Sequence, residues 1–130
     1  MVMVVLAVLA AIVIPRFMNR NQQAKEAALK SDLTILRKGI AGYYADTGYY
    51  PLTLTDLTAT TAPANGDDST GTNQPIVAAN WHGPYLQAAG APNDPVSGTA
   101  FTYSTTSGTV GNITSSATGS GLDGTAYSTW

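Results

Sequence analysis

The sequence predicts an α+β protein in which one long N-terminal helix packs part of its length on a small antiparallel sheet. Three observations carry this prediction. Residues 1–14 are all apolar, residues 29–43 hold an apolar stripe with helical spacing, and residues 100–114 contain two short runs rich in β-branched and aromatic side chains. At 130 residues the chain has room for one modest core. We therefore expect an apolar half of the helix that protrudes and an amphipathic half that packs on the sheet.

The apolar run is too short to cross a bilayer unless the helix continues beyond it. Residues 1–14 read MVMVVLAVLAAIVI and would measure about 21 Å as a helix, whereas a crossing needs about 20 residues. A cleaved signal peptide would have basic residues before the run, but Arg16 and Arg20 follow it. A core helix would show a polar face, and this run has none. We expect residues 1–24 to be buried in lipid or against copies of the chain, through Val4, Val5, Leu6, Val8, Leu9, Ile12, Ile14, Pro15 and Phe17.

The next stretch has the pattern of an amphipathic helix. Its apolar positions recur at steps of four, three, four and three, and would pack against the rest of the head: Leu29, Leu33, Leu36, Ile40 and Tyr43. Charged residues occupy the other faces, and Glu26 and Lys30 are spaced as a favourable i,i+4 pair. Joined to the apolar run, this stretch gives one helix of about 44 residues and about 66 Å. Pro15 has no backbone N–H to donate, so we expect it to kink or loosen this helix.

A globular head is expected over residues 25–130. Gly48 is a candidate C-cap for the helix, and Pro51 lies just beyond it. The leucines that follow predict a short extended piece or one helical turn: Leu52, Leu54 and Leu57. Residues 59–74 are rich in Thr, Asn, Gly and Asp, and predict a long surface loop.

The C-terminal third carries the signals of the sheet. Residues 92–95 read Pro-Asn-Asp-Pro, a strong turn signal. Strands are expected over residues 100–104 and 109–114, with the turn supplied by Ser107 and Gly108. Residues 126–130 are expected to form a docked tail.

Composition excludes several classes of function. The chain has no cysteine, so it holds no disulfide scaffold, zinc finger or thiol nucleophile. Its single histidine, His82, does not favour a histidine-based metal site or a Ser-His-Asp relay. The net charge of −2 does not indicate the basic surface that binding to nucleic acid requires. We expect no enzyme and no organic cofactor.

Several motifs follow the long helix in a recognisable order. They are Tyr43-Tyr-x-Asp46-x-Gly48-x-Tyr50-Pro51, then Gly83-Pro-Tyr85-Leu86, then Asn93-Asp94-Pro95-x-x-Gly98-x-x-Phe101-x-Tyr103. Together with the apolar run and its proline, they resemble type IV pilins and type II secretion pseudopilins over most of residues 1–104. In that family a basic leader precedes a Phe-Thr-Leu-Ile-Glu-like start of the mature protein. Residues 3–5 resemble the stretch just after that glutamate, which would place it near Met1.

The resemblance implies a pilin-like fold and a structural role. Such subunits wait in the inner membrane and are extracted by an assembly machine into a helical filament of identical copies. The function expected first is the major pilin of an extracellular type IV pilus-like filament. The alternatives are the major pseudopilin of a type II secretion system in the periplasm, a minor tip pilin that binds DNA or a surface, and a lone membrane-anchored binding domain. Filaments of this family often lose helicity at the proline, so we expect a loosened stretch near residues 11–17.

A calcium site is a further implication of the resemblance, because major pseudopilins carry one in their C-terminal loop. Here Gly121-Leu-Asp123-Gly124 resembles part of that loop, without its adjacent acidic pair. Asp123 is the best candidate ligand. The alternative is an aspartate that caps backbone N–H groups in a turn.

Overall fold

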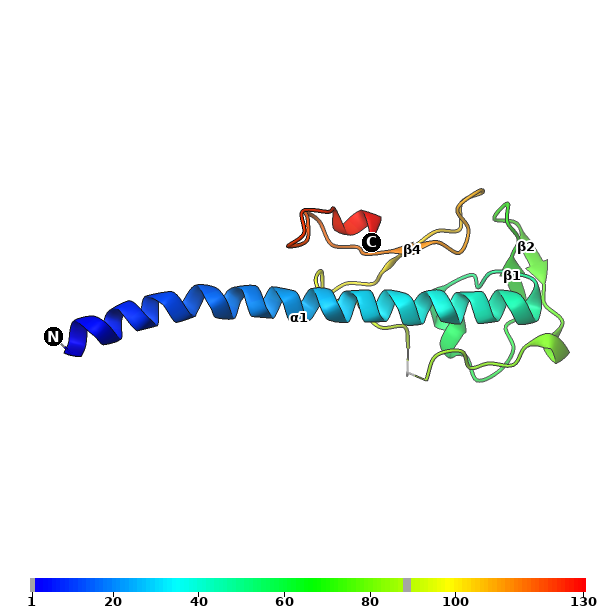
Figure 1. Cartoon of the computed structure of the whole chain (residues 1–130). Coiled ribbons are helices and arrows are strands. Elements are labelled where there is room, and N and C mark those ends of the chain that lie inside the picture. Colours follow the sequence, from blue (N-terminus) through cyan, green and yellow to red (C-terminus); the bar gives the residue numbers. More distant parts are fainter. Residues whose placement is uncertain (1, 88–89) are drawn as a thin grey trace.

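One long helix organises the whole molecule. The computed structural model describes the backbone of residues 2–87 and 90–130, and the side chains of residues 20–87 and 90–130. Helix α1 (Val2–Thr47) has 46 residues, and its N-terminal half extends away from the rest of the chain (Figure 1). All other elements are short and lie alongside the C-terminal half of α1. This is the expected α+β arrangement, with the apolar part protruding and the amphipathic part packed.

Helix α1 is continuous over the stretch where loosening was expected. The helix is assigned without a break through residues 11–17, so that expectation is wrong for the described backbone. A single proline removes one hydrogen bond from the ladder, and the bonds on either side can continue. At its other end α1 closes as expected, because Gly48 adopts φ 78° and donates its N–H to the carbonyl oxygen of Tyr44 at 2.8 Å.

Two small antiparallel sheets replace the single sheet that was expected. Strands β1 (Asn65–Asp67) and β2 (Asn73–Pro75) pair with each other, as do β3 (Thr102–Tyr103) and β4 (Ile113–Thr114). The first hairpin begins inside the loop predicted over residues 59–74 and ends one residue beyond it, and it was missed. The second pair is shorter than predicted, because hydroxyl groups between its strands bind one another and local N–H groups. Ser104 Oγ, for example, lies 2.7 Å from Thr109 Oγ1.

The core lies between α1 and the segments laid along it. The stripe on α1 is buried, with Leu29, Leu36 and Tyr43 fully inaccessible. Opposite the stripe lie apolar side chains from five separate segments: Leu54, Leu57, Leu86, Phe101, Ile113 and Tyr127. Leu54 and Leu57 belong to the short 3₁₀ helix η1 (Leu54–Thr58), which forms where one helical turn was expected. Two further 3₁₀ turns are η2 (Ala78–Asn80) and η3 (Tyr127–Thr129), the second of them in the expected docked tail.

Within the part of the chain whose side chains are described, no helix combines the length and apolar character needed to cross a membrane. The apolar residues predicted to be buried in lipid or in a filament core, from Val4 to Phe17, lie outside that part.

Candidate functional site

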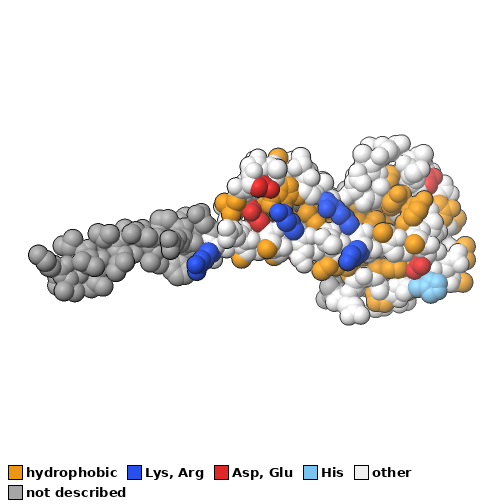
Figure 2. All heavy atoms as spheres, viewed as in Figure 1, with side chains coloured by type: hydrophobic (Ala, Val, Ile, Leu, Met, Phe, Trp, Pro, Cys, Tyr) orange, Lys and Arg blue, Asp and Glu red, His pale blue; other side chains and the backbone are white. Residues whose placement is uncertain are grey.

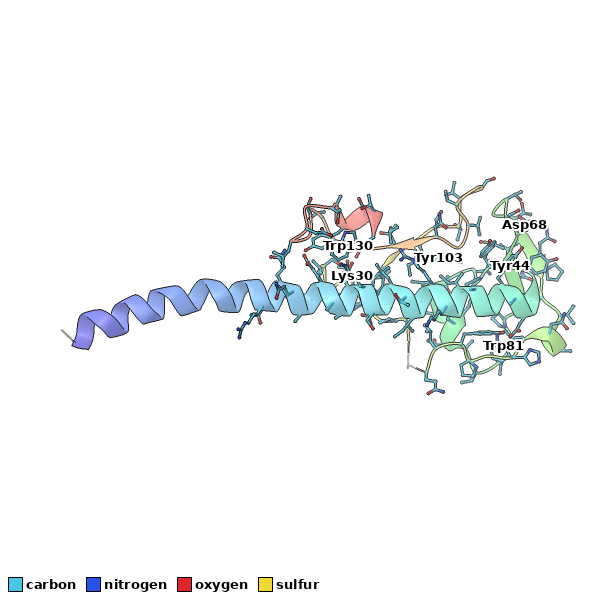
Figure 3. All side chains as sticks on the ribbon, viewed as in Figure 1. Lys30, Tyr44, Asp68, Trp81, Tyr103 and Trp130 are labelled. Carbon is cyan, nitrogen blue, oxygen red and sulfur yellow. The ribbon has the colours of Figure 1, made fainter. Side chains whose placement is uncertain are left out.

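Three side chains on the middle of α1 hold the last twelve residues of the chain. Glu26, Lys30 and Arg37 all contact the segment formed by residues 119–130, and we call these three residues together with that segment the C-terminal clamp. Figure 3 shows Lys30 and Trp130 lying next to each other, one on α1 and the other at the end of the segment. The clamp lies at the end of the head that is nearer the N-terminus, where the protruding half of α1 begins (Figure 1). It therefore fixes the C-terminal segment to α1 at that end.

Glu26 is the buried centre of the clamp. Only 8% of its surface is exposed, and its Oε1 accepts hydrogen bonds from the backbone N–H of Leu122 at 2.8 Å and from the hydroxyl of Tyr127 at 2.8 Å. Gln22, one turn earlier on α1, donates its side-chain amide to the same oxygen at 3.3 Å. The carboxylate is therefore hydrogen-bonded to two points of the C-terminal segment.

The expected i,i+4 pair between Glu26 and Lys30 is wrong, because the two side chains take separate partners. The ammonium of Lys30 lies 4.6 Å from the centroid of the Trp130 ring, which is a cation–π arrangement. Arg37 donates hydrogen bonds to the carbonyl oxygen of Ile113 at 3.1 Å and to the main-chain oxygen of Trp130. An open groove of about 500 Å³ runs between α1 and the segment at this point.

The residues around Asp123 do not fit a calcium ion. Asp123 Oδ1 accepts the backbone N–H of Thr125 at 2.9 Å and its hydroxyl at 2.7 Å. These hydrogen bonds, and the nearby charge of Lys30, lower the pKa of Asp123. Calcium takes about six to eight oxygen ligands, yet the described residues include no group of three His, Cys, Asp or Glu side chains placed to hold a metal. Asp123 has the geometry of a turn-capping aspartate, and its role as a calcium ligand stays a prediction that its neighbours do not favour.

Asp94 is a second buried carboxylate, and it joins the turn at residues 92–95 to strand β4. Its side chain is fully buried. One oxygen accepts the backbone N–H groups of Val96 at 2.7 Å and Ser97 at 3.1 Å, and the other accepts the hydroxyl of Ser115 and the N–H of Ser116 at 3.0 Å. Burial alone would raise the pKa of Asp94, but these hydrogen bonds outweigh it and lower the pKa below its usual value.

A third polar cluster lies at the far end of the head from the N-terminus. The hydroxyl of Tyr85 donates to Asp46 Oδ2 at 2.6 Å, and Nδ1 of His82 lies 3.6 Å from the same oxygen. The side chain of His82 is 70% exposed, and Figure 2 shows the single histidine on the surface at that end. Tyr85 also packs edge-on against Tyr43 and Trp81. The cluster tethers the segment around residue 84 to the end of α1.

The sequence prediction located the packing stripe but missed the clamp and the buried aspartate. Glu26 and Lys30 were placed outside the apolar stripe and paired with each other, because helix periodicity distinguishes apolar from polar positions and does not identify a buried polar side chain. Asp94 was placed in a turn, and its ties to Ser115 and Ser116 have no signal in the local sequence. The proposed filament residues cannot be placed, since their side chains lie outside the described part of the chain.

Comparison with protein families gives one result. Residues 16–127 match the family model described as type II secretion system (T2SS), protein G. Comparisons with curated proteins and with solved structures returned no match. The matched family is one of structural subunits and not an enzyme class.

Proposed function

This chain belongs to the type II secretion system protein G family, and on that premise we propose that it is the major pseudopilin of such a system. In this role it is a structural subunit that polymerises through the N-terminal half of α1. The inner membrane holds it before assembly, and the periplasm contains the assembled pseudopilus. Its partners are further copies of itself and the secretion machinery. The observation that carries the proposal, beside the family, is a helix far longer than its own head can cover.

Helix α1 is so long that its apolar N-terminal run needs burial outside the head, and polymerisation provides that burial. At 1.5 Å per residue its 46 residues span about 69 Å, and the first buried side chain among those described is Glu26. The preceding run is apolar at every position from 1 to 14. Apolar side chains are buried comparably well by lipid and by neighbouring helices. The same helix can therefore be held in a membrane first and in a bundle of copies afterwards.

The distribution of charge supports stacking of copies along the helix axis. All six basic residues lie on α1 between residues 16 and 38, and Figure 2 shows basic side chains along the described part of that helix. Three partly exposed acidic residues follow toward the other end of the head, at Asp46, Asp56 and Asp68. In a filament, neighbouring copies are shifted relative to each other along the axis of α1. Such a shift brings the basic residues 16–38 of one copy toward the acidic end of the head of the next. Opposite charges across such an interface favour that register.

The family match revises the order of the sequence-based expectations. An extracellular type IV pilus was expected first and the secretion pseudopilin second, but the matched family supports the second better. Within the described residues no feature favours a tip subunit that binds DNA, because the basic side chains lie along the helix that copies share. The pseudopilin is therefore the function we propose.

Substitution of Leu9 by Lys tests polymerisation through the apolar run. An ionised side chain in this run costs about 2.5–3.5 kcal/mol in an apolar environment, so we expect pseudopilus yield to fall at least about tenfold. The measurement is electron microscopy and cross-linking of full-length chain from overproducing cells.

Leu9→Val is the matched control, because it keeps the position apolar and should assemble almost normally. Thermal unfolding of each full-length variant in detergent should show an unchanged head transition. Normal assembly of Leu9→Lys would contradict the proposal.

A further inference from the structure

The loop at residues 119–125 is closed by its own backbone. Gly121 donates its N–H to the carbonyl oxygen of Thr125 at 2.8 Å, and Gly124 donates to that of Gly121 at 3.0 Å. Just beyond the loop, the N–H of Tyr127 reaches the carbonyl oxygen of Gly119 at 3.2 Å. These carbonyl oxygens already have protein donors. The loop thus has a folded conformation that uses its own N–H groups as partners.

A positive charge lies beside the loop, because Lys30 and Asp123 line the same groove. Lys30 lies over the ring of Trp130, and the indole N–H of Trp130 donates to Thr125 Oγ1 at 2.6 Å. Thr125 in turn donates to Asp123. This chain of contacts joins α1 to the only carboxylate of the loop. An ammonium group in this position supplies the charge that a bound cation would otherwise bring, and it repels a second cation.

Glu26 holds the loop against α1 through two hydrogen bonds. It accepts the N–H of Leu122 in the middle of the loop and the hydroxyl of Tyr127 just after it. The packing leaves no room for a side chain on Gly121, since a Cβ there would lie 2.5 Å from the Trp130 ring and 3.1 Å from Glu26 Oε1. The two α1 residues therefore act on one compact unit from adjacent turns of the helix.

We propose that Glu26 and Lys30 together fix the C-terminal loop in the place of a metal ion, so that the head of this protein folds without calcium. Glu26 binds the loop by accepting its hydrogen bonds, and Lys30 balances the carboxylate of Asp123. This inference rests on contacts within one subunit and stands apart from the proposed role in secretion.

Hydrogen exchange at the amide of Leu122, measured on the full-length chain in detergent, tests the inference. In the wild type, exchange should differ by less than about twofold between calcium chloride and EGTA, because the loop needs no metal to close. Glu26→Ala removes the acceptor and should speed exchange at this amide about 10- to 100-fold in either solution. Glu26→Gln, which keeps an acceptor but loses the charge, should give a smaller increase.

Lys30→Met tests the charge, and Lys25→Met is its matched control. Lys25 is an exposed lysine on the same helix, so its substitution should leave exchange at Leu122 and Thr125 unchanged. Lys30→Met should speed exchange at Thr125, and calcium should not restore it. The inference is overturned if EGTA speeds exchange in the wild type, or if both Glu26 variants exchange as slowly as Lys25→Met. If Glu26→Ala does not fold, the inference is tested by amide exchange in Glu26→Gln and by the comparison of calcium chloride with EGTA in the wild type.

Discussion

Replacing Leu36 with alanine lowers the free energy of unfolding of the head by about 2–5 kcal/mol. Leu36 is fully buried at the centre of the stripe on α1, where it packs in the cluster that joins the helix to the other segments of the head. Truncation removes three carbon atoms from that contact and leaves a cavity that the surrounding helix cannot close. Urea unfolding of the full-length chain in detergent, followed by tyrosine fluorescence, measures the loss.

Ile35 provides a matched control for Leu36 on the neighbouring position of the same helix. Its side chain is 50% exposed, so Ile35→Ala should change the free energy of unfolding by less than about 0.5 kcal/mol. Equal losses for the two substitutions would show that the stripe is not the packed face of α1.

Replacing Asp94 with alanine lowers the free energy of unfolding by at least about 3 kcal/mol. The substitution leaves the N–H groups of Val96, Ser97 and Ser116 and the hydroxyl of Ser115 without the carboxylate that they share. Buried donors without an acceptor lose their hydration and gain nothing in return. Chemical unfolding at neutral pH gives the size of the effect, and a loss below about 1 kcal/mol would contradict this account of the turn.

Asp94 also predicts how stability changes with pH. Its pKa is lower in the folded head than in the unfolded chain, so ionised Asp94 stabilises the head above the unfolded pKa of about 3.9. That contribution is lost as the pH falls through the lowered folded pKa. Asp94→Asn keeps the shape without the charge, so its stability should be lower at neutral pH and approach that of the wild type in acid. A stability gap that stays constant with pH would exclude this linkage.

The long helix could be predicted because its signals are local and periodic. The stripe from Leu29 to Tyr43 repeats at helical spacing, and Gly48 marks the end at a position where the backbone needs a positive φ. Both features depend on residues close together in the chain. The same holds for the helical turn near Leu54, where the side chain of Asp56 accepts the backbone N–H of Thr53 at 3.1 Å.

The strands could be predicted only in part, because contacts distant in sequence decide them. Strands β1 and β2 consist mainly of Asn, Gly, Asp and Gln, and such residues have low strand propensity. Tyr50 stabilises this hairpin from outside, since it exchanges two backbone hydrogen bonds of 2.8 Å with Asp67. The sequence of residues 65–75 alone does not indicate that Tyr50 pairs with Asp67.

The clamp could not be predicted for a related reason. Glu26 lies 96 residues from Leu122 and 101 from Tyr127, so no motif links them. One signal was nevertheless present: Glu26 is 60° from Leu29 around the helix at 100° per residue, on the edge of the buried stripe. A glutamate at such an edge has to find hydrogen-bond donors, and the C-terminal segment provides them.

These results describe a subunit with two separate sources of stability. The head has its own core, and the buried carboxylates of Glu26 and Asp94 tie distant segments of it together. The backbone of the N-terminal half of α1 extends away from the head, and in the proposed function its apolar side chains are buried by lipid and then by other copies of the chain. Substitutions at Leu36 or Asp94 should therefore reduce the amount of folded subunit, whereas Leu9→Lys should spare the head and prevent polymerisation.

Secretion by cells that lack this chain tests the central proposal most directly. We expect the substrates of the type II system to accumulate in the periplasm, and the wild-type chain to restore their release while Leu9→Lys does not. Surface pili are counted by electron microscopy in the same cells and should be unchanged. Normal secretion together with a loss of long surface pili would contradict the proposal and identify the chain as a pilus subunit instead.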